Sequence, residues 1–80
     1  MDRQKQSYLM FKLDSCKPGS YKILSTKPWS NRLEELGFIS GKKLYLIANN
    51  ILGIRIRINN VVYLFDKDTA STIYVQTIEV

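Results

Sequence analysis

The chain has 80 residues, a net charge of +5, one cysteine and no histidine, so it forms one small domain without an intrachain disulfide. Without histidine, serine and cysteine lack the usual partner for nucleophilic catalysis, and a zinc site of the Cys/His kind would have at most one ligand. We therefore expect no enzymatic activity, no catalytic residues, no cofactor and no metal site.

The positive charge is uneven along the chain. From Met1 to Lys27 there are six basic residues against Asp2 and Asp14. This balance suits an acidic partner such as nucleic acid, a membrane surface or an acidic protein. Small domains also carry such charge for solubility, and we favour this second interpretation. The single cysteine, the lack of an apolar run of about 20 residues and the polar start at Met1–Ser7 predict a cytoplasmic protein.

The first part of the chain consists of short extended segments joined by turns. Residues 1–8 have no apolar periodicity and are predicted to be a flexible leader before a single domain at 9–80. A strand over 8–13, which starts at the last residue of the leader, is predicted first, followed by a helical turn over 14–16, a turn at Lys17-Pro18-Gly19 and a strand over 20–25.

The stretch from Asn31 to Lys43 is the only one with a helical pattern. Leu33 and Leu36 lie three residues apart and share a helix face. Gly37 follows at the position of a left-handed C-terminal cap, which favours a residue without a Cβ atom. The sequence therefore predicts one short helix.

Apolar residues flank this helix. Trp29, one turn before it, either packs the helix onto the core or serves as an exposed anchor for a partner. Phe38 and Ile39 are predicted to turn inward after the helix, and Phe38 is also a candidate contact for a partner.

The second half of the chain reads as strands. We predict them over 43–49, 54–58, 61–65 and 72–80, joined by a loop at 49–53, a two-residue hairpin at Asn59-Asn60 and a helical turn at 66–70. In the first of these strands, Leu44, Leu46 and Ala48 are predicted to share one face. In the second, isoleucines face inward while Arg55 and Arg57 face outward.

Five or six short strands at about ten-residue spacing, with one short helix, predict an all-β fold. A closed antiparallel barrel avoids the exposed apolar edges that a small flat sheet would have. The fold class that we expect is therefore a small antiparallel β-barrel.

Three features allow a structural and a functional interpretation. Arg55 and Arg57 either bind nucleic acid or protect a strand edge. Cys16 is either a small buried hydrophobe or a ligand, and we favour burial. Asp66 and Asp68 either bind a hard cation or cap a turn, and we favour the cap.

Four short motifs together resemble the ferrous iron transport protein A (FeoA) family. They are Leu13-x-x-Cys16-Lys17-Pro18-Gly19, Arg32-Leu33-x-x-Leu36-Gly37-Phe38-x-x-Gly41, Gly53-Ile54-x-Ile56-x-Ile58 and Ala70-x-x-Ile73-x-Val75. The resemblance covers about Phe11 to Gln76. It implies an SH3-like barrel of five to six strands.

The same resemblance implies a small cytoplasmic accessory protein of bacterial ferrous iron uptake. Its partner would be FeoB, a membrane protein with a GTP-binding domain fused to an iron-transporting membrane domain, so contact with the membrane would be indirect. The chain departs from the family pattern at Asn49–Leu52, where a loop that is often acidic or proline-containing is expected, and at Phe65, where arginine is common.

The expected mechanism is protein–protein contact without catalysis. The candidate contact residues are Arg32, Leu33, Leu36, Phe38, Arg55 and Arg57, of which Leu33 and Leu36 are assigned to the core first and to a groove second. Two alternatives stay open: a free-standing SH3-like interaction domain of the metal-dependent repressor type, and a small-barrel nucleic-acid-binding protein. We expect no nucleic-acid partner, and weak self-association stays open.

Overall fold

The computed structural model describes residues 10–26 and 31–78, so the predicted leader and Trp29 lie outside the described residues. The chain runs through β1 (Phe11–Lys12), the 3-10 turn η2 (Leu13–Ser15), β2 (Gly19–Thr26), α1 (Asn31–Glu35), β3 (Lys43–Asn50), β4 (Gly53–Ile58), β5 (Val61–Phe65), α2 (Lys67–Ala70) and β6 (Ile73–Thr77). The six strands form one antiparallel sheet in the order β1-β6-β2-β3-β4-β5.

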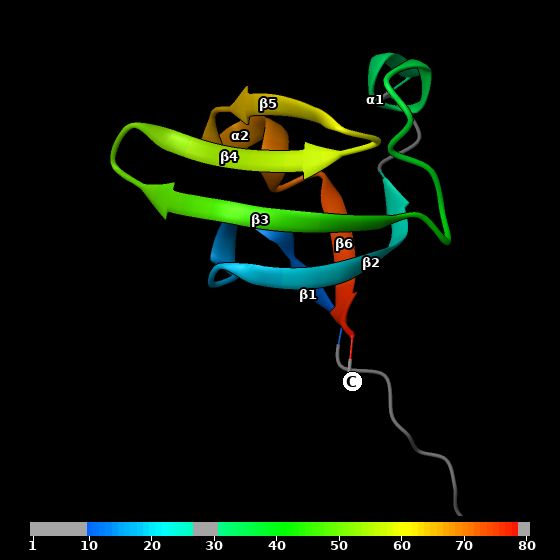
Figure 1. The fold of residues 1–80 in the computed structure, drawn as a ribbon, viewed down its shortest axis with the longest axis horizontal. Helices are drawn as coiled ribbons and strands as arrows, with labels where there is room; N and C mark the ends of the chain where they lie inside the picture. The colour runs from blue at the N-terminus through cyan, green and yellow to red at the C-terminus, as the bar shows by residue number, and fades with distance from the viewer. Residues whose placement is uncertain (1–9, 27–30, 79–80) are drawn as a thin grey trace, which may run out of the picture.

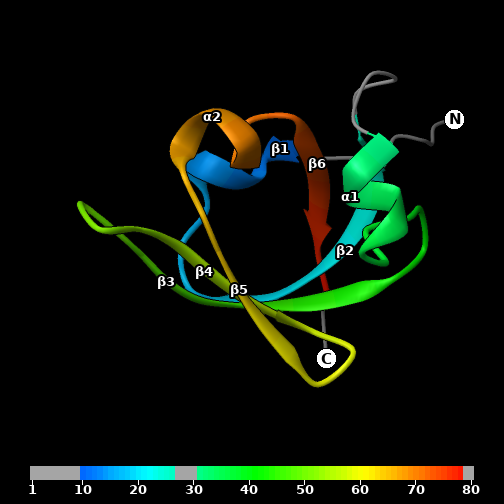
Figure 2. The same ribbon diagram turned by 90° about the horizontal axis from the view of Figure 1, so that it is seen from above.

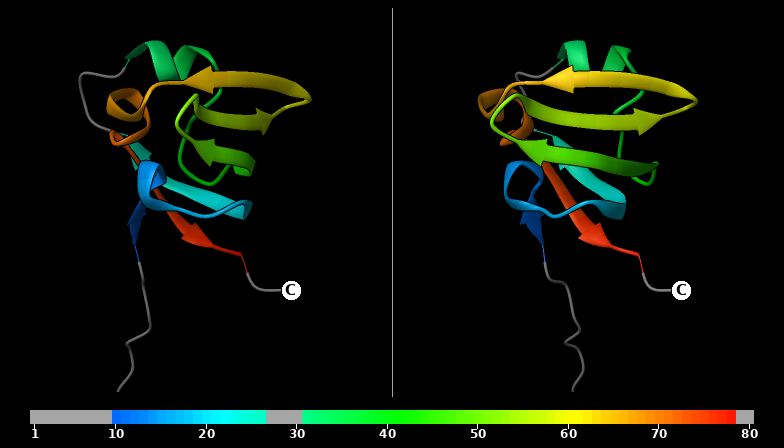
Figure 3. Two further views of the ribbon diagram at one scale, coloured as in Figure 1. Left: turned by 90° about the vertical axis from the view of Figure 1, so that its left-hand side faces the viewer. Right: turned by 60° about the vertical axis from the view of Figure 1, so that its left-hand side comes forward.

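The sheet curls into a small barrel (Figures 1 and 2). Among the described strands, the two end strands β1 and β5 do not pair with each other, so the barrel is open along that side. The helices α1 and α2 lie towards the same end of the barrel as β5 (Figure 3). The structure confirms the predicted all-β fold, with six strands.

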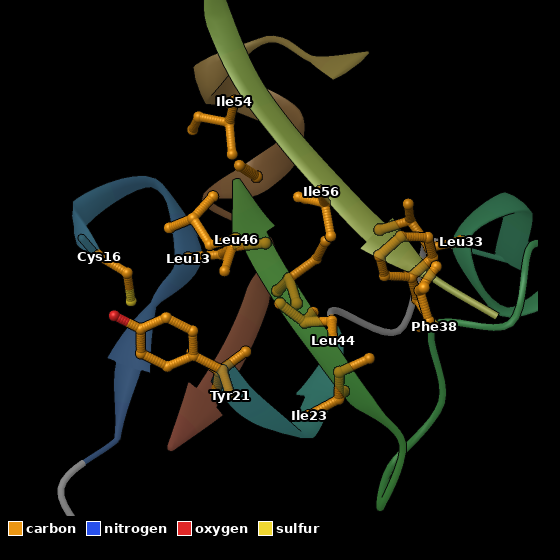
Figure 4. Packing of buried hydrophobic residues seen from close by; sticks show 14 residues of the cluster. Leu13, Cys16, Tyr21, Ile23, Leu33, Phe38, Leu44, Leu46, Ile54 and Ile56 are labelled. Atoms are coloured by element: carbon orange, nitrogen blue, oxygen red, sulfur yellow. The ribbon is translucent and has the colours of Figure 1, made fainter. Parts of the chain in front are cut away.

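The core comes from the inward faces of β2, β3, β4 and β6. Its fully buried side chains include Ile23 on β2, Leu46 on β3, Ile54 and Ile56 on β4, and Val75 on β6 (Figure 4). The alternation predicted for 54–58 is confirmed, because Arg55 and Arg57 are exposed between buried isoleucines. Neither of the described helices is long and apolar enough to cross a bilayer.

The predicted alternation in 43–49 is wrong after Leu46, because β3 contains a bulge. Leu46 pairs with Ile56, but the next pair joins Ala48 to Arg55. The extra residue, Ile47, reverses the faces that follow it, since opposed residues share a face. Ala48 therefore lies on the outer side with Arg55 instead of sharing a face with Leu46.

The bulge also turns Asn49 inward, at a position that the sequence placed where the predicted strand meets the predicted loop. Its side-chain amide donates to the carbonyl oxygens of Asp14 at 3.0 Å and Cys16 at 2.9 Å. These bonds attach η2 to the end of β3. Strand β3 continues to Asn50 and β4 begins at Gly53, so only Ile51 and Leu52 of the predicted loop form a turn.

The predicted hairpin at Asn59-Asn60 is confirmed. Both residues have a positive φ, of 53° and 65°. This conformation suits the right-handed twist of the two strands that the hairpin joins, and asparagine tolerates it better than most residues.

The end of α1 is a Schellman motif around Gly37. Gly37 has a φ of 101°, its N–H donates to the carbonyl of Glu34 at 3.0 Å, and the Phe38 N–H donates to the carbonyl of Leu33 at 2.9 Å. The motif sends the chain back onto the core. Phe38 is accordingly buried, with 0% exposure, whereas Ile39 is 46% exposed and does not turn inward as predicted.

We predict that Gly37→Ala lowers the free energy of unfolding by about 1–3 kcal/mol, measured by chemical denaturation. An added Cβ atom would meet the Asn59 side-chain nitrogen at 2.8 Å, in addition to the strain of the positive φ. Gly41→Ala is the matched control, because Gly41 has a φ of 92° with no heavy atom within 4 Å of an added Cβ. Equal losses in the two variants would contradict a contact between Gly37 and the hairpin.

Candidate functional site

The candidate site is a groove of about 470 Å³ between the two helices. We call it the α1–α2 groove, and its lining residues are Arg32, Leu33, Leu36, Phe65, Asp68, Thr69 and Thr72. Three of the predicted contact residues, Arg32, Leu33 and Leu36, therefore lie together in it. Its apolar residues come from α1, from the turn directly after α1 and from the end of β5.

An aromatic cluster supports this groove from behind. The Phe38 ring lies 5.4 Å from the Tyr63 ring and 5.3 Å from the Phe65 ring, measured between centroids, and the latter two rings are 5.9 Å apart. The Tyr63 hydroxyl donates to the Leu36 carbonyl at 3.5 Å. These contacts hold the end of α1 against β5. Phe38 is thus a buried support beside Leu33 (Figure 4), and its prediction as a surface contact is wrong.

The other wall of the groove is α2, which is capped by Asp66. The Asp66 carboxylate accepts a hydrogen bond from the Thr69 N–H at 2.8 Å, which confirms the predicted cap. Hydrogen bonds from Thr69 lower the pKa of the Asp66 carboxyl from its ordinary value. Asp68 and Arg32, both exposed, give the groove one acidic and one basic residue on opposite walls.

We predict that Asp66→Ala lowers the melting temperature near neutral pH and that the difference from the wild type shrinks as the solution is acidified. The pKa of Asp66 is lower in the folded state than in the unfolded one, so its contribution is present above the unfolded pKa and is lost as pH falls through the folded pKa. Thermal melts over a pH series measure this difference.

Asp66→Asn is the control for this titration, because an amide oxygen also caps a helix but carries no charge. We expect the difference between the Asn and Ala variants to change little with pH. A constant difference between wild type and Asp66→Ala across the acid range would contradict the role of the ionised carboxylate.

The other two predicted contacts, Arg55 and Arg57, do not lie in the groove. Both are exposed on the outer face of β4, opposite Ala48 and Tyr45 of β3. Arg57 also lines a second hollow of about 390 Å³, beside Lys43 and the Asn59-Asn60 hairpin. The six predicted residues therefore divide into three in the groove, one in the core and two on the outer face of the sheet.

Charge is segregated in the described part of the chain. All charged residues within strands are basic and exposed: Lys12, Lys22, Lys43, Arg55 and Arg57. The described acidic residues all belong to helices, to the 3-10 turn or to a helix cap: Asp14, Glu34, Glu35, Asp66 and Asp68. The outer face of the sheet is therefore positive.

Sequence reasoning missed the far wall of the groove, made by Phe65, Asp68, Thr69 and Thr72. A local signal existed for α2, because Asp66 was recognised as a cap candidate. Its proximity to α1 follows from the curl of the sheet, which brings elements about 35 residues apart to one end of the barrel.

Cys16 packs in the core. It is 8% exposed, its thiol donates to the Lys12 carbonyl at 3.4 Å, and burial raises the pKa of the thiol. It lies beside the Tyr21 hydroxyl (Figure 4), which donates to the Lys17 carbonyl at 2.6 Å. Among residues 10–26 and 31–78, no three His, Cys, Asp or Glu side chains are grouped so as to hold a metal ion.

We predict that Fe(II) added under anaerobic conditions leaves the melting temperature unchanged, and that a chelator has no effect either. Iron(II) sites need clusters of imidazole, carboxylate or thiolate groups, and the buried thiol of Cys16 would have to lose its proton first. A saturable increase in melting temperature with Fe(II) would show that the protein holds a site of its own.

Comparison with known proteins rests on structure. No protein-family model matches this sequence, and no curated protein matches it. The solution structure of a FeoA protein from Chlorobium tepidum superposes with a TM-score of 0.75 at 24% identity, covering 86% of this chain and 71% of that one. FeoA from Stenotrophomonas maltophilia, solved with zinc, superposes with a TM-score of 0.71 at 16% identity, covering 82% of this chain and 89% of that one.

The S. maltophilia protein is described as a prokaryotic SH3 domain protein and as a candidate ferrous iron transport activating factor. A manganese-dependent transcriptional repressor also superposes, with a TM-score of 0.79 at 15% identity over 94% of this chain. This chain spans only 45% of that repressor. The fold that the motifs implied is thereby confirmed: the protein has the SH3-like fold of the FeoA proteins.

Proposed function

We propose that this protein is a cytoplasmic accessory protein of bacterial ferrous iron uptake. It acts by contact with the cytosolic GTP-binding domain of a FeoB-type membrane transporter, and it performs no catalysis. The α1–α2 groove is the surface that binds this domain.

The observation that carries the proposal is the position of the longest FeoA-like motif. Arg32, Leu33 and Leu36 belong to that motif and line the groove, while Gly37 and Phe38 of the same motif hold α1 in place. The fold shared with FeoA proteins, one of which is described as a candidate iron transport activating factor, supports the same function.

The chemistry of the groove suits a short apolar segment of a partner. Leu36 and Phe65 offer apolar surface whose burial contributes about 25 cal/mol per Å². Arg32 and Asp68 on opposite walls add little energy in solvent but fix the orientation of a polar partner. This composition, an apolar centre with a charged rim, is that of a protein-binding site.

We predict that Leu36→Ala weakens binding to the GTP-binding domain by about tenfold and that Arg32→Ala weakens it by about two- to fivefold, both measured by calorimetry. Ile51→Ala is the control, because Ile51 is an equally apolar and highly exposed residue on the β3–β4 turn, outside the groove. Equal effects of all three substitutions would move the binding surface away from the groove. If the wild-type protein does not bind the GTP-binding domain, the proposed function is overturned.

A second candidate function is that of a free-standing repressor-type interaction domain. The observation in its favour is the superposition on the manganese-dependent repressor over 94% of this chain. The test is to measure binding to a metal-dependent repressor truncated before its own SH3-like domain, in parallel with the GTP-binding domain. Selective binding to the truncated repressor would replace the transporter hypothesis.

A third candidate, a nucleic-acid-binding barrel, has the positive outer face of the sheet in its favour. Titration with single-stranded and duplex DNA or RNA tests it. Strong, salt-sensitive binding that is lost in an Arg55→Ala, Arg57→Ala double variant would favour it over the transporter hypothesis.

A further inference from the structure

The strand β5 has an open edge. It is the last strand in the sheet order and pairs only with β4. In a two-residue hairpin the flanking residues, here Ile58 and Val61, form a hydrogen-bonded pair, and such pairs alternate along the ladder. The N–H and C=O groups of Val62 and Leu64 therefore point away from β4. Within the described residues, no hydrogen bond reaches them.

This edge lacks the usual protection against pairing. The strand reads Val-Val-Tyr-Leu-Phe, without charge or proline, and its register with β4 shows no bulge. Val62 and Leu64 are 50% and 60% exposed. Natural edge strands are normally blunted by lysine, proline or a bulge. In Figure 2, which looks onto β5 from above, no described segment crosses in front of it.

The open edge borders the α1–α2 groove. Tyr63 and Phe65 form the inner row of β5, and Phe65 lines the groove. A strand added antiparallel to β5 would alternate its side chains between the two faces. One set would enter the groove over Phe65, and the other would lie beside Val62 and Leu64 on the outer face.

The outer face gives the added strand a preferred charge. Val62 is opposite Arg57, and Leu64 is opposite Arg55, in the β4–β5 pair. Neither arginine takes part in an ion pair within the described residues, and β5 itself carries no charge. Acidic side chains on the outer face of an added strand would therefore meet unpaired cations.

We propose that the protein binds its partner by strand addition to β5. The partner segment is extended, with aliphatic side chains facing the α1–α2 groove and acidic side chains facing Arg55 and Arg57. This mode of recognition rests on the proposed function, whose partner it describes in more detail. A second copy of the chain fits less well, because it would bring a further +5 charge and no acidic residue on its own β5.

The sharpest test is Val62→Pro. The Val62 N–H faces away from β4, so proline removes one donor of the open edge and leaves the β4–β5 hydrogen bonds intact. Val62→Thr is the matched control, because it keeps the N–H and the β-branched shape. We expect Val62→Pro to bind the cytosolic GTP-binding domain at least about tenfold more weakly than the wild type, and Val62→Thr to bind like the wild type.

Both variants must first show a wild-type pattern of β4–β5 amide protection, which separates loss of the edge from loss of the fold. If Val62→Pro fails this check, Leu64→Pro replaces it, since the Leu64 N–H also faces outward. Equal binding by a folded proline variant and the wild type would overturn strand addition while leaving the proposed function in place.

Hydrogen exchange gives an independent readout in the wild-type complex. The Val62 and Leu64 amides should exchange quickly in the free protein and become protected when the GTP-binding domain is bound. The Val61, Tyr63 and Phe65 amides should be protected in both states, because they bond to β4. Continued fast exchange at Val62 and Leu64 in the complex would overturn the proposal.

If the GTP-binding domain does not bind the wild type, the proposed function fails. A pair of peptides then tests separately whether the open edge of β5 accepts an added strand. The probe is acetyl-Glu-Leu-Glu-Leu-Glu-Leu-amide, and its control is the same peptide N-methylated at its edge-facing amides. Protection of Val62 and Leu64 by the first peptide alone supports strand addition, and protection by neither or both overturns it. Protection that depends only on the protein's own concentration would mean that a second copy occupies the edge.

Discussion

The packing of Phe38 against Tyr63 and Phe65 is the contact on which the rest of the site depends. The helix α1 has only five residues and α2 only four, far fewer than an isolated helix needs in water. The turn at Gly37 that buries Phe38 is one anchor of α1, and the carboxylate of Asp66 is one anchor of α2. Each helix also places one residue in the core cluster. The shape of the groove therefore depends on these contacts.

The longest motif accordingly combines two roles within a few residues. Leu33 is 5% exposed and belongs to the core cluster, yet it also lines the groove. Leu36 is partly buried and accepts a hydrogen bond from Tyr63 through its carbonyl. Substitutions at Leu33 will disturb stability and binding together, whereas Arg32, which is exposed on the same helix, reports on binding more cleanly.

Local rules were enough for most of the fold. The isoleucine alternation of β4, the asparagine pair of its hairpin, the cap glycine and the cap aspartate each depend on a few neighbouring residues. The burial of Phe38 also follows from a local rule, which argues against its role as a surface contact for a partner. In a Schellman motif the residue after the glycine usually packs back onto the helix, and here it lies beside Leu33.

Three features could not be predicted from the sequence: the bulge in β3, the α1–α2 groove and the open edge of β5. The bulge at Ile47 has no signature in the sequence, because the residues from Leu44 to Asn49 fit an alternating strand with or without an extra residue. Only the pairing with β4 determines which register forms. The groove combines α1 with α2, and the open edge of β5 depends on the final strand order. The groove and the open edge follow from the curl of the sheet and the order of its strands, which sequence periodicity does not encode.

In the described part of the chain the strands carry only basic charges, whereas the helices with their cap are net acidic despite Arg32 and Lys67, and this difference gives that part of the molecule an electric dipole. In the field of any anionic body it experiences a torque as well as an attraction, so it turns before contact is made. The outer side of the sheet then faces the anion, and the helices face away. Orientation on approach is thus encoded in which secondary structure carries which sign of charge, and raising the salt concentration would erase it.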